Sequence, residues 1–267
     1  MLDAVVQDLQ DETTAIVSVL AGLRASSWEA PTPAAGWSIR DQVTHLAFFD
    51  DATVLAMTDP DAFCAQRDEL LALGDGFPDD VAARFRAMAP ADCLEWFTTS
   101  RRTLLSTYLS LDPAHRLPWY GPDMGMASSA TGRLMETWAH GQDVVDTVGL
   151  VRPPTSRLRS VADLGVRTFA FAFALNGRPV PTAAVRVELD GPEGERWEWG
   201  PADAADRITG AALDFCLLVT QRRNLQDTGL TVTGPVASEW ATVAQAYAGG
   251  VGAGRPAGRF ADTGRAS

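Results

Sequence analysis

The chain has 267 residues and a formal net charge of −12 at neutral pH. Its hydrophobic fraction of 46% and charged fraction of 21% are typical of a globular protein that can bury its own core. All 22 basic residues are arginines, and the excess of acidic residues argues against nucleic acid as the main partner.

The cysteine count and the hydropathy exclude two further classes. Cys64, Cys93 and Cys216 are too few and too widely spaced for a disulfide framework or a cysteine-based zinc site. No apolar run reaches the roughly 20 residues that a membrane-spanning helix needs, and the N-terminus does not resemble a signal peptide. We therefore expect a cytoplasmic protein without a membrane partner.

The first 150 residues predict a helical bundle. Apolar residues at helical spacing indicate a helix over residues 2–24, and a stretch rich in proline and glycine follows it. Ser38 with Asp41 three positions later is a variant of the capping box, which predicts a helix over about residues 38–57. Further helices are expected over residues 60–72, 79–88, 90–111 and 129–148, with an irregular segment at 112–129 and Gly149 as a C-cap.

The remaining sequence predicts a mixed α/β region. A helix over about residues 156–176 is followed by alternating residues on either side of Gly191–Gly194, which indicate a β-hairpin. A helix over 208–221, a short strand in "GLTVTG" and a closing helix in "VASEWATVAQAYAG" complete the pattern. The expected fold class is therefore α + α/β. The expected domains are a bundle over 1–152, an α/β domain over 153–250 and a flexible tail over 251–267.

Two segments carry residues suited to metal binding. Glu136 and His140 lie one turn apart on the predicted helix 129–148, and His45 lies on the predicted helix 38–57. Two imidazoles and a carboxylate form a common first shell for a catalytic divalent metal, because they leave coordination positions open. Spacing alone leaves a second interpretation, in which Glu136 and His140 form an ordinary surface ion pair.

The same segments resemble a known family. "GWSIRDQVTHLAFFD" (36–50) resembles the second-helix motif of the DinB-like metal-binding superfamily, and "GRLMETWAHGQDVVDTVG" (132–149) is similar to a motif of its mycothiol-dependent maleylpyruvate isomerase branch. The resemblance covers about residues 1–150. It implies an N-terminal DinB-like four-helix bundle. Residues 180–247 resemble, more weakly, a sterol-carrier-protein-2-like domain.

The resemblance implies a ligand set and an activity. His45, Glu136 and His140 are the implied ligands of a divalent metal, usually Zn²⁺, with Fe²⁺ or Ni²⁺ as alternatives. Mycothiol is the implied cosubstrate, and the implied activity is a maleylpyruvate-isomerase-like isomerisation or an S-transfer on a small electrophilic substrate. The expected partner is thus a small molecule, and the chain is expected to be a monomer or a homodimer.

Other functions remain open at this point. The same ligands suit a thiol-independent metal enzyme of a biosynthetic pathway, such as a hydrolase, a lyase or an iron-dependent oxidoreductase. A non-catalytic metal-binding module is a further alternative. A shared scaffold does not select the reaction.

Several further residues are candidates for the same site. Arg101 and Arg133 are expected either to bind a substrate carboxylate or to lie on a solvated helix face. Tyr120 is a catalytic candidate in the irregular segment, whose large side chains are expected either to form a lid or to pack in the ordinary way; the others are Trp119, Met124 and Met126. Asp143 is expected either to orient a ligand imidazole or to face water.

Overall fold

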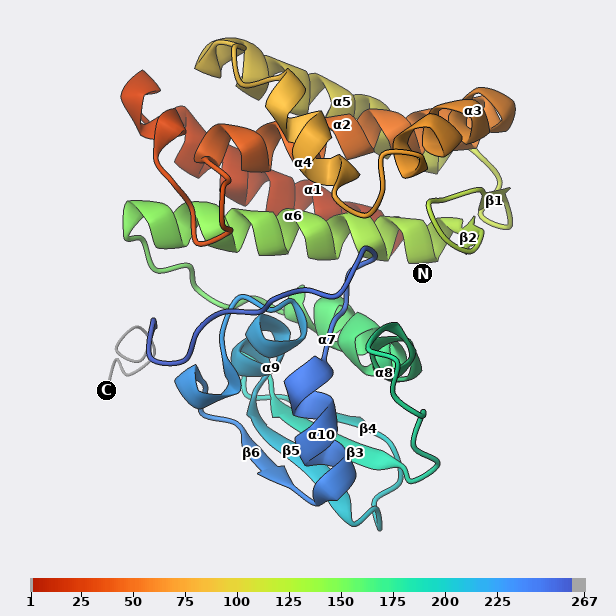
Figure 1. Ribbon diagram of the computed structural model, residues 1–267, viewed down its shortest axis with the longest axis vertical. Helices are drawn as coiled ribbons and strands as arrows, with labels where there is room; N and C mark the ends of the chain where they lie inside the picture. The colour runs from red at the N-terminus through yellow and green to blue at the C-terminus, as the bar shows by residue number, and fades with distance from the viewer. Residues whose placement is uncertain (1, 261–267) are drawn as a thin grey trace. The chain divides into compact units, whose positions relative to one another are not determined.

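The computed structural model describes residues 2–260, and the chain divides into two compact units between Arg152 and Pro153. The first unit is built mainly from helices, and the second combines a sheet with shorter helices (Figure 1). The predicted fold class, a helical bundle followed by a smaller mixed α/β domain, is confirmed.

Four long helices make up most of the first unit within the described residues. They are α1 (Leu2–Ala21), α2 (Ile39–Thr58), α5 (Pro90–Ser110) and α6 (Met126–Val148). The connecting elements are η1 (Ala25–Glu29), α3 (Pro60–Leu71), α4 (Phe77–Arg84), β1 (Arg116–Leu117) and β2 (Met124–Gly125). Each of α1 and α2 packs against both α5 and α6, which is the arrangement of a four-helix bundle.

Local sequence signals position the two helices that carry the histidines. The Ser38 hydroxyl accepts a hydrogen bond from the Asp41 backbone N–H, and the Asp41 carboxylate accepts one from the Ser38 N–H at 2.8 Å. This reciprocal capping box starts α2 where the sequence predicts it. Gly149 ends α6 in the left-handed conformation with φ of 70°, which glycine adopts without steric penalty.

The second unit contains a four-stranded sheet in the order β4-β3-β5-β6. Its strands are β3 (Val185–Asp190), β4 (Arg196–Trp199), β5 (Asp206–Ala211) and β6 (Thr231–Thr233). Its helices are α7 (Leu158–Arg167), α8 (Phe169–Leu175), α9 (Ala212–Val219) and α10 (Pro235–Val243), and residues 225–227 form a short 3-10 helix, η2 (Leu225–Asp227). The predicted hairpin is present as the antiparallel pair β3–β4, whereas β3 and β5 run parallel.

Alternation along β3 places its apolar and charged side chains on opposite faces. Val187 and Leu189 are fully buried, while Glu188 between them is partly exposed. Helix α10 contacts β5 and β6 and lies across the sheet in Figure 1. The buried Trp240 of α10 packs edge-on against Phe215 of α9, so these helices cover one face of the sheet.

Three predictions for the second unit are wrong in detail. The predicted helix over 208–221 begins only at Ala212, because residues 206–211 pair with β3 as a strand. Pairing between segments that lie far apart in sequence overrides local preference here. The predicted helix over 156–176 is interrupted at Thr168, and the closing helix ends at Val243. Of the predicted tail, residues 251–260 carry no helix or strand, and residues 261–267 lie outside the described residues.

Across residues 2–260, no helix combines the length and the apolar character that crossing a bilayer requires.

Candidate metal centre

The structure brings His45, Glu136 and His140 together in the first unit. His45 lies on α2, and Glu136 and His140 lie one turn apart on α6. Helices α2 and α6 pack against each other, so side chains separated by about ninety positions in sequence become neighbours. We call these three residues the triad.

The distances within the triad are close to those of a metal ligand set. His140 Nε2 lies 3.0 Å from Glu136 Oε2, and His45 Nε2 lies 3.9 Å from the same oxygen. One ligand atom from each residue lies within 4.8 Å of the other two. Ligands at about 2.0–2.1 Å from a tetrahedral Zn²⁺ lie roughly 3.3 Å apart, so small side-chain movements suffice to enclose a cation. The two imidazoles and the carboxylate also have suitable donor chemistry.

The electrostatic surroundings keep Glu136 ionised. Burial raises the pKa of Glu136, but the hydrogen bond with His140 and the charges of His140, His45 and Arg133 outweigh it and lower the pKa to about 2. An ionised carboxylate is the form that binds a cation. The side chains of His45, Glu136 and His140 remain 12%, 21% and 10% exposed, so a small ligand has access to them.

Aromatic side chains flank the triad. The Trp37 ring stacks on His140 with centroids 5.8 Å apart and is tilted against His45 at 5.1 Å. Phe49 packs against the other imidazole, His45, at 4.6 Å. The Trp37 indole N–H donates to Asp79 at 2.6 Å and thereby fixes the orientation of that ring. Aromatic packing thus helps to hold both imidazoles, by stacking at His140 and by tilted contacts at His45.

Gln42 is a contact of the triad that the sequence did not reveal. Its side chain is fully buried, and its Oε1 lies 2.5 Å from His140 Nδ1. The sequence also offered Asp143 of α6, which is fully buried and so does not face water; its role in orienting a ligand imidazole stays a prediction. Gln42 lies one turn before His45 on α2, and that spacing is the only sequence signal that could have identified it.

The two candidate arginines are buried around Asp50 and do not face solvent. Asp50 is fully buried, and its carboxylate accepts hydrogen bonds from Arg101 at 2.7 and 3.1 Å and from Arg133 at 3.0 Å. Arg101 also donates to the hydroxyls of Thr13 and Thr137. We call Asp50, Arg101 and Arg133 the buried hub. All three guanidinium nitrogens of Arg101 donate to protein groups, so the geometry gives no support to binding of a substrate carboxylate by Arg101. Arg133 donates from Nε to Asp50 and from Nη2 to the Leu46 carbonyl, and its role as a substrate-binding residue stays a prediction.

The irregular segment packs against α2, α3 and α4. Tyr120 contacts the rings of Phe49, Phe63 and Phe77, and Trp119 stacks on Phe63 at 5.7 Å. Burial raises the pKa of Tyr120 to about 12, so its hydroxyl stays protonated at neutral pH. Met126 is fully buried and Met124 partly buried in the core around α1 and α5. Of the two expectations for this segment, packing is the one that the contacts support.

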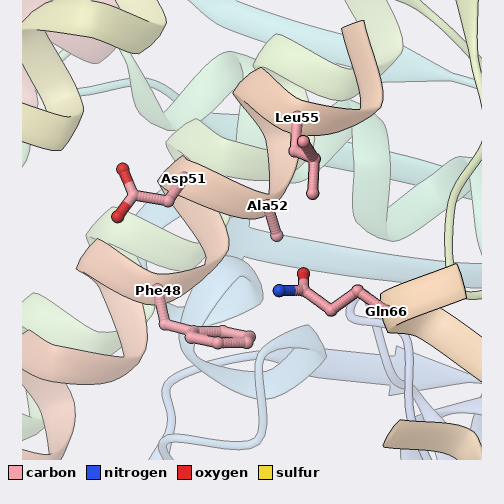
Figure 2. Close-up of a pocket in the computed structure, with 5 residues that line it drawn as sticks. All are labelled: Phe48, Asp51, Ala52, Leu55 and Gln66. Carbon is pink, nitrogen blue, oxygen red and sulfur yellow. The ribbon is translucent and has the colours of Figure 1, made fainter. Parts of the chain in front are cut away.

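A separate hollow of about 310 Å³ lies between α2 and α3. Its lining residues are Phe48, Asp51, Ala52, Leu55 and Gln66. Figure 2 shows the Gln66 amide pointing from α3 toward the α2 side chains, and the Asp51 carboxylate turned away from it. Asp51 accepts a hydrogen bond from the Trp96 indole at 2.7 Å. No member of the triad lines this hollow, so it is distinct from the candidate metal centre.

The sequence pattern that defines the mycothiol maleylpyruvate isomerase N-terminal domain matches residues 9–145, a span that includes the whole triad. The chain belongs to this family. A second family pattern, described as wyosine base formation, matches residues 181–232, which include β3, β4, β5 and most of β6. The sterol-carrier-protein-2-like character of that unit stays a prediction.

The chain is also similar to known proteins over most of its length. Uncharacterized proteins from two strains of Mycobacterium tuberculosis are each 46% identical to the chain over 250 residues, which cover 94% of this chain and 97% of theirs. Crystal structures of a mycothiol-dependent maleylpyruvate isomerase and of its histidine-to-alanine mutant superpose with TM-scores of 0.59 and 0.61 at 14% identity. Each superposition covers 87% of this chain and 92% of the isomerase, and at this identity it establishes a shared fold.

Proposed function

We propose that the chain is a divalent-metal-dependent enzyme that uses a thiol of the mycothiol type to isomerise, or to form an S-conjugate of, a small electrophile. The observation that carries this proposal is the triad. Two imidazoles and an ionised carboxylate converge within 4.8 Å and remain partly accessible, in a chain of the mycothiol maleylpyruvate isomerase family.

The triad residues would hold the metal, for which we propose Zn²⁺, although the same donor set also suits Fe²⁺. A bound divalent cation supplies positive charge that favours the deprotonated form of a thiol or of water at neutral pH. The protein's own contribution is positional. Trp37 and Phe49 pack against the imidazoles, and three ligands would leave further coordination positions for the reacting molecule.

The state of the cysteines favours a thiol supplied from outside the chain. Burial raises the pKa of Cys93 to about 11, and burial also raises the pKa of Cys216. Cys64 is partly buried on α3 and, like the other two, is not a member of the triad. Since thiolate is the reactive form, Cys93 and Cys216 are poor nucleophiles at neutral pH.

The proposed reaction needs neither an oxidant nor a reductant. The thiolate sulfur forms a bond to one carbon of a C=C double bond. The π electron pair of that double bond moves through the conjugated system onto a carbonyl oxygen. Rotation about the resulting C–C single bond, return of the electron pair and departure of the thiolate complete a cis–trans isomerisation. With a leaving group on the attacked carbon, the same sulfur attack gives an S-conjugate.

The metal is tested by elemental mass spectrometry on the purified full-length protein. We expect about one zinc ion per chain in the wild type, lost in His45→Ala and in His140→Ala. His115→Ala is the matched control, because His115 lies in the segment before β1, outside the triad, and should retain the metal. Wild-type protein that binds no divalent metal after reconstitution would refute the proposed centre.

The thiol is tested by turnover of maleylpyruvate, and of an activated aryl halide, with and without mycothiol. We expect turnover of at least one of these substrates by the zinc-loaded wild type, only when mycothiol is present, and none by His140→Ala. A zinc-loaded protein that converts neither substrate contradicts the thiol-dependent reaction. Bound iron together with oxygen consumption would instead favour the iron-dependent oxidoreductase.

A further inference from the structure

A chain of hydrogen bonds leads from the loop before α2 to His140. The Gln42 side chain is fully buried on α2 and makes two contacts. Its Oε1 lies 2.5 Å from His140 Nδ1, and its Nε2 donates to the Thr32 hydroxyl at 2.8 Å. Thr32 is itself buried, so these bonds form away from solvent.

Thr32 determines which end of the Gln42 amide faces His140. The Thr32 hydroxyl has one proton, which it donates to the Trp37 backbone carbonyl at 2.8 Å. Its lone pairs are therefore left to accept from the Gln42 Nε2. The Gln42 oxygen then faces His140, and an amide oxygen can only accept a hydrogen bond.

We infer that Gln42 is a positioning residue of the metal centre: its oxygen holds the proton on His140 Nδ1 and so leaves the Nε2 lone pair directed at the metal. His140 Nε2 lies 3.0 Å from Glu136 Oε2, and a metal bound there would take the place of the proton that joins these two atoms. This inference rests on the proposed metal centre and adds a residue to it. Metal-binding histidines commonly donate their second N–H to such an acceptor, which fixes the ring and raises its basicity.

The opposite amide orientation would have the opposite effect. If Gln42 turned its Nε2 toward His140, Nδ1 would have to accept, and the proton would move to the Nε2 that faces Glu136. A protonated Nε2 has no lone pair for a metal. Turning the amide would also divert the Thr32 proton away from the Trp37 carbonyl, so the existing bonds favour the metal-competent form.

The primary test is zinc affinity, measured by competition with a chromogenic chelator on the full-length protein. Gln42→Met removes the acceptor at similar volume and should weaken zinc binding by about 10- to 100-fold. Gln42→Glu keeps an oxygen acceptor and should restore affinity to within about threefold of the wild type, since carboxylates serve this role in other metal sites. Gln142→Met is the matched control, because Gln142 is also buried and bonds to Asp146 and Arg152 outside the triad.

A spectroscopic readout does not depend on any variant. The chain contains only three histidines, so the imidazole region of a long-range ¹H–¹⁵N spectrum of the zinc-loaded protein is simple to assign. We expect His140 to carry its proton on Nδ1 and to bind zinc through Nε2. Coordination through Nδ1, or a proton on Nε2, would overturn the inference even if Gln42→Met failed to fold.

The outcomes separate the inference from the function on which it rests. Weaker zinc binding in Gln42→Met, with Gln42→Glu and Gln142→Met near the wild type, supports the positioning role. A wild type that binds zinc together with an equally tight Gln42→Met overturns that role and leaves the metal centre intact. A wild type that binds no divalent metal removes the metal centre, and the inference fails with it.

Discussion

Each unit of the molecule contains an acidic residue surrounded by arginines from neighbouring elements. In the first unit, Asp50 of α2 bonds to Arg101 of α5 and Arg133 of α6, and all three side chains are at most 4% exposed. In the second unit, Glu188 of β3 faces arginines at 3.3 to 3.6 Å on three strands; they are Arg186, Arg196 and Arg207. We call Glu188 and these arginines the surface cluster.

The surface cluster and the buried hub differ in how far their side chains are exposed to solvent. In the surface cluster, the side chains of Arg196 and Arg207 are 48% and 34% exposed, so water and salt screen their charges. In the buried hub, burial lowers the pKa of Arg101, while its contacts with Asp50 favour the charged form. Similar chemistry thus has different consequences. A buried ion pair leaves an uncompensated charge when one partner is lost, whereas an exposed pair is largely replaced by water.

The largest expected effect is that of breaking the buried hub. Asp50→Asn leaves the charges of Arg101 and Arg133 without their carboxylate, and we expect the free energy of unfolding to fall by about 3–5 kcal/mol. Chemical denaturation followed by circular dichroism measures the change. Asp51→Asn is the matched control at the next position, because Asp51 is exposed and bonds to Trp96. A loss below about 1 kcal/mol for Asp50→Asn would mean that the hub behaves like a surface pair.

The surface cluster should respond far less. Glu188→Gln removes the charge that its three arginines share, although neighbouring acidic groups such as Glu198 and Asp190 still pair with Arg186 and Arg196. We expect a small fall in the thermal midpoint that shrinks further in high salt. Thermal melts of the wild type and Glu188→Gln at low and high salt test this. A fall as large as that of Asp50→Asn, and insensitive to salt, would erase the distinction between the two clusters.

The smallest effect is expected at Asp51 and depends on pH. Although the Asp51 residue is exposed, partial desolvation of its carboxylate raises its pKa above the ordinary value of 3.8; the Trp96 hydrogen bond opposes this, and the charge of Asp50 adds to it. A raised pKa in the folded state means that the unfolded state ionises first. Stability is therefore lost as the pH rises through the ordinary value and on to the folded pKa.

Asp51→Asn keeps an acceptor for Trp96 and removes the ionisation. We expect the variant to be slightly more stable than the wild type at pH 7 and equal to it near pH 3, as measured by thermal melts across this range. A stabilisation that persists at low pH would show that the effect is not one of charge.

Local signals account for the parts of the fold that the sequence predicted well. Helix α2 begins at Ile39 because Ser38 and Asp41 cap it, and this capping motif can be recognised in the sequence without knowledge of the tertiary structure. The local sequence of β5 predicts a helix. The segment forms a strand because β3, about twenty positions earlier in the chain, supplies its hydrogen bonds. Gly210 in β5 adopts φ of 144°, which a helix excludes.

The candidate site, like the fold, could be predicted from the sequence only in part. The motifs indicated which three residues to bring together, and the packing of α2 on α6 makes them neighbours. The environment of the arginines was not predictable, because Asp50 is 51 positions from Arg101 and 83 from Arg133. Gln42 was missed for the same reason, since its partner His140 lies 98 positions away.

Arg133 belongs to the buried hub and also acts on the triad. It donates to Asp50, and its charge helps to lower the pKa of Glu136 one turn further along α6. A substitution of Arg133 that changes the pKa of Glu136 therefore also weakens the packing of α2 against α6. Evolution cannot adjust the two independently, and mutations at Asp50, Arg133 and Glu136 should show strong epistasis.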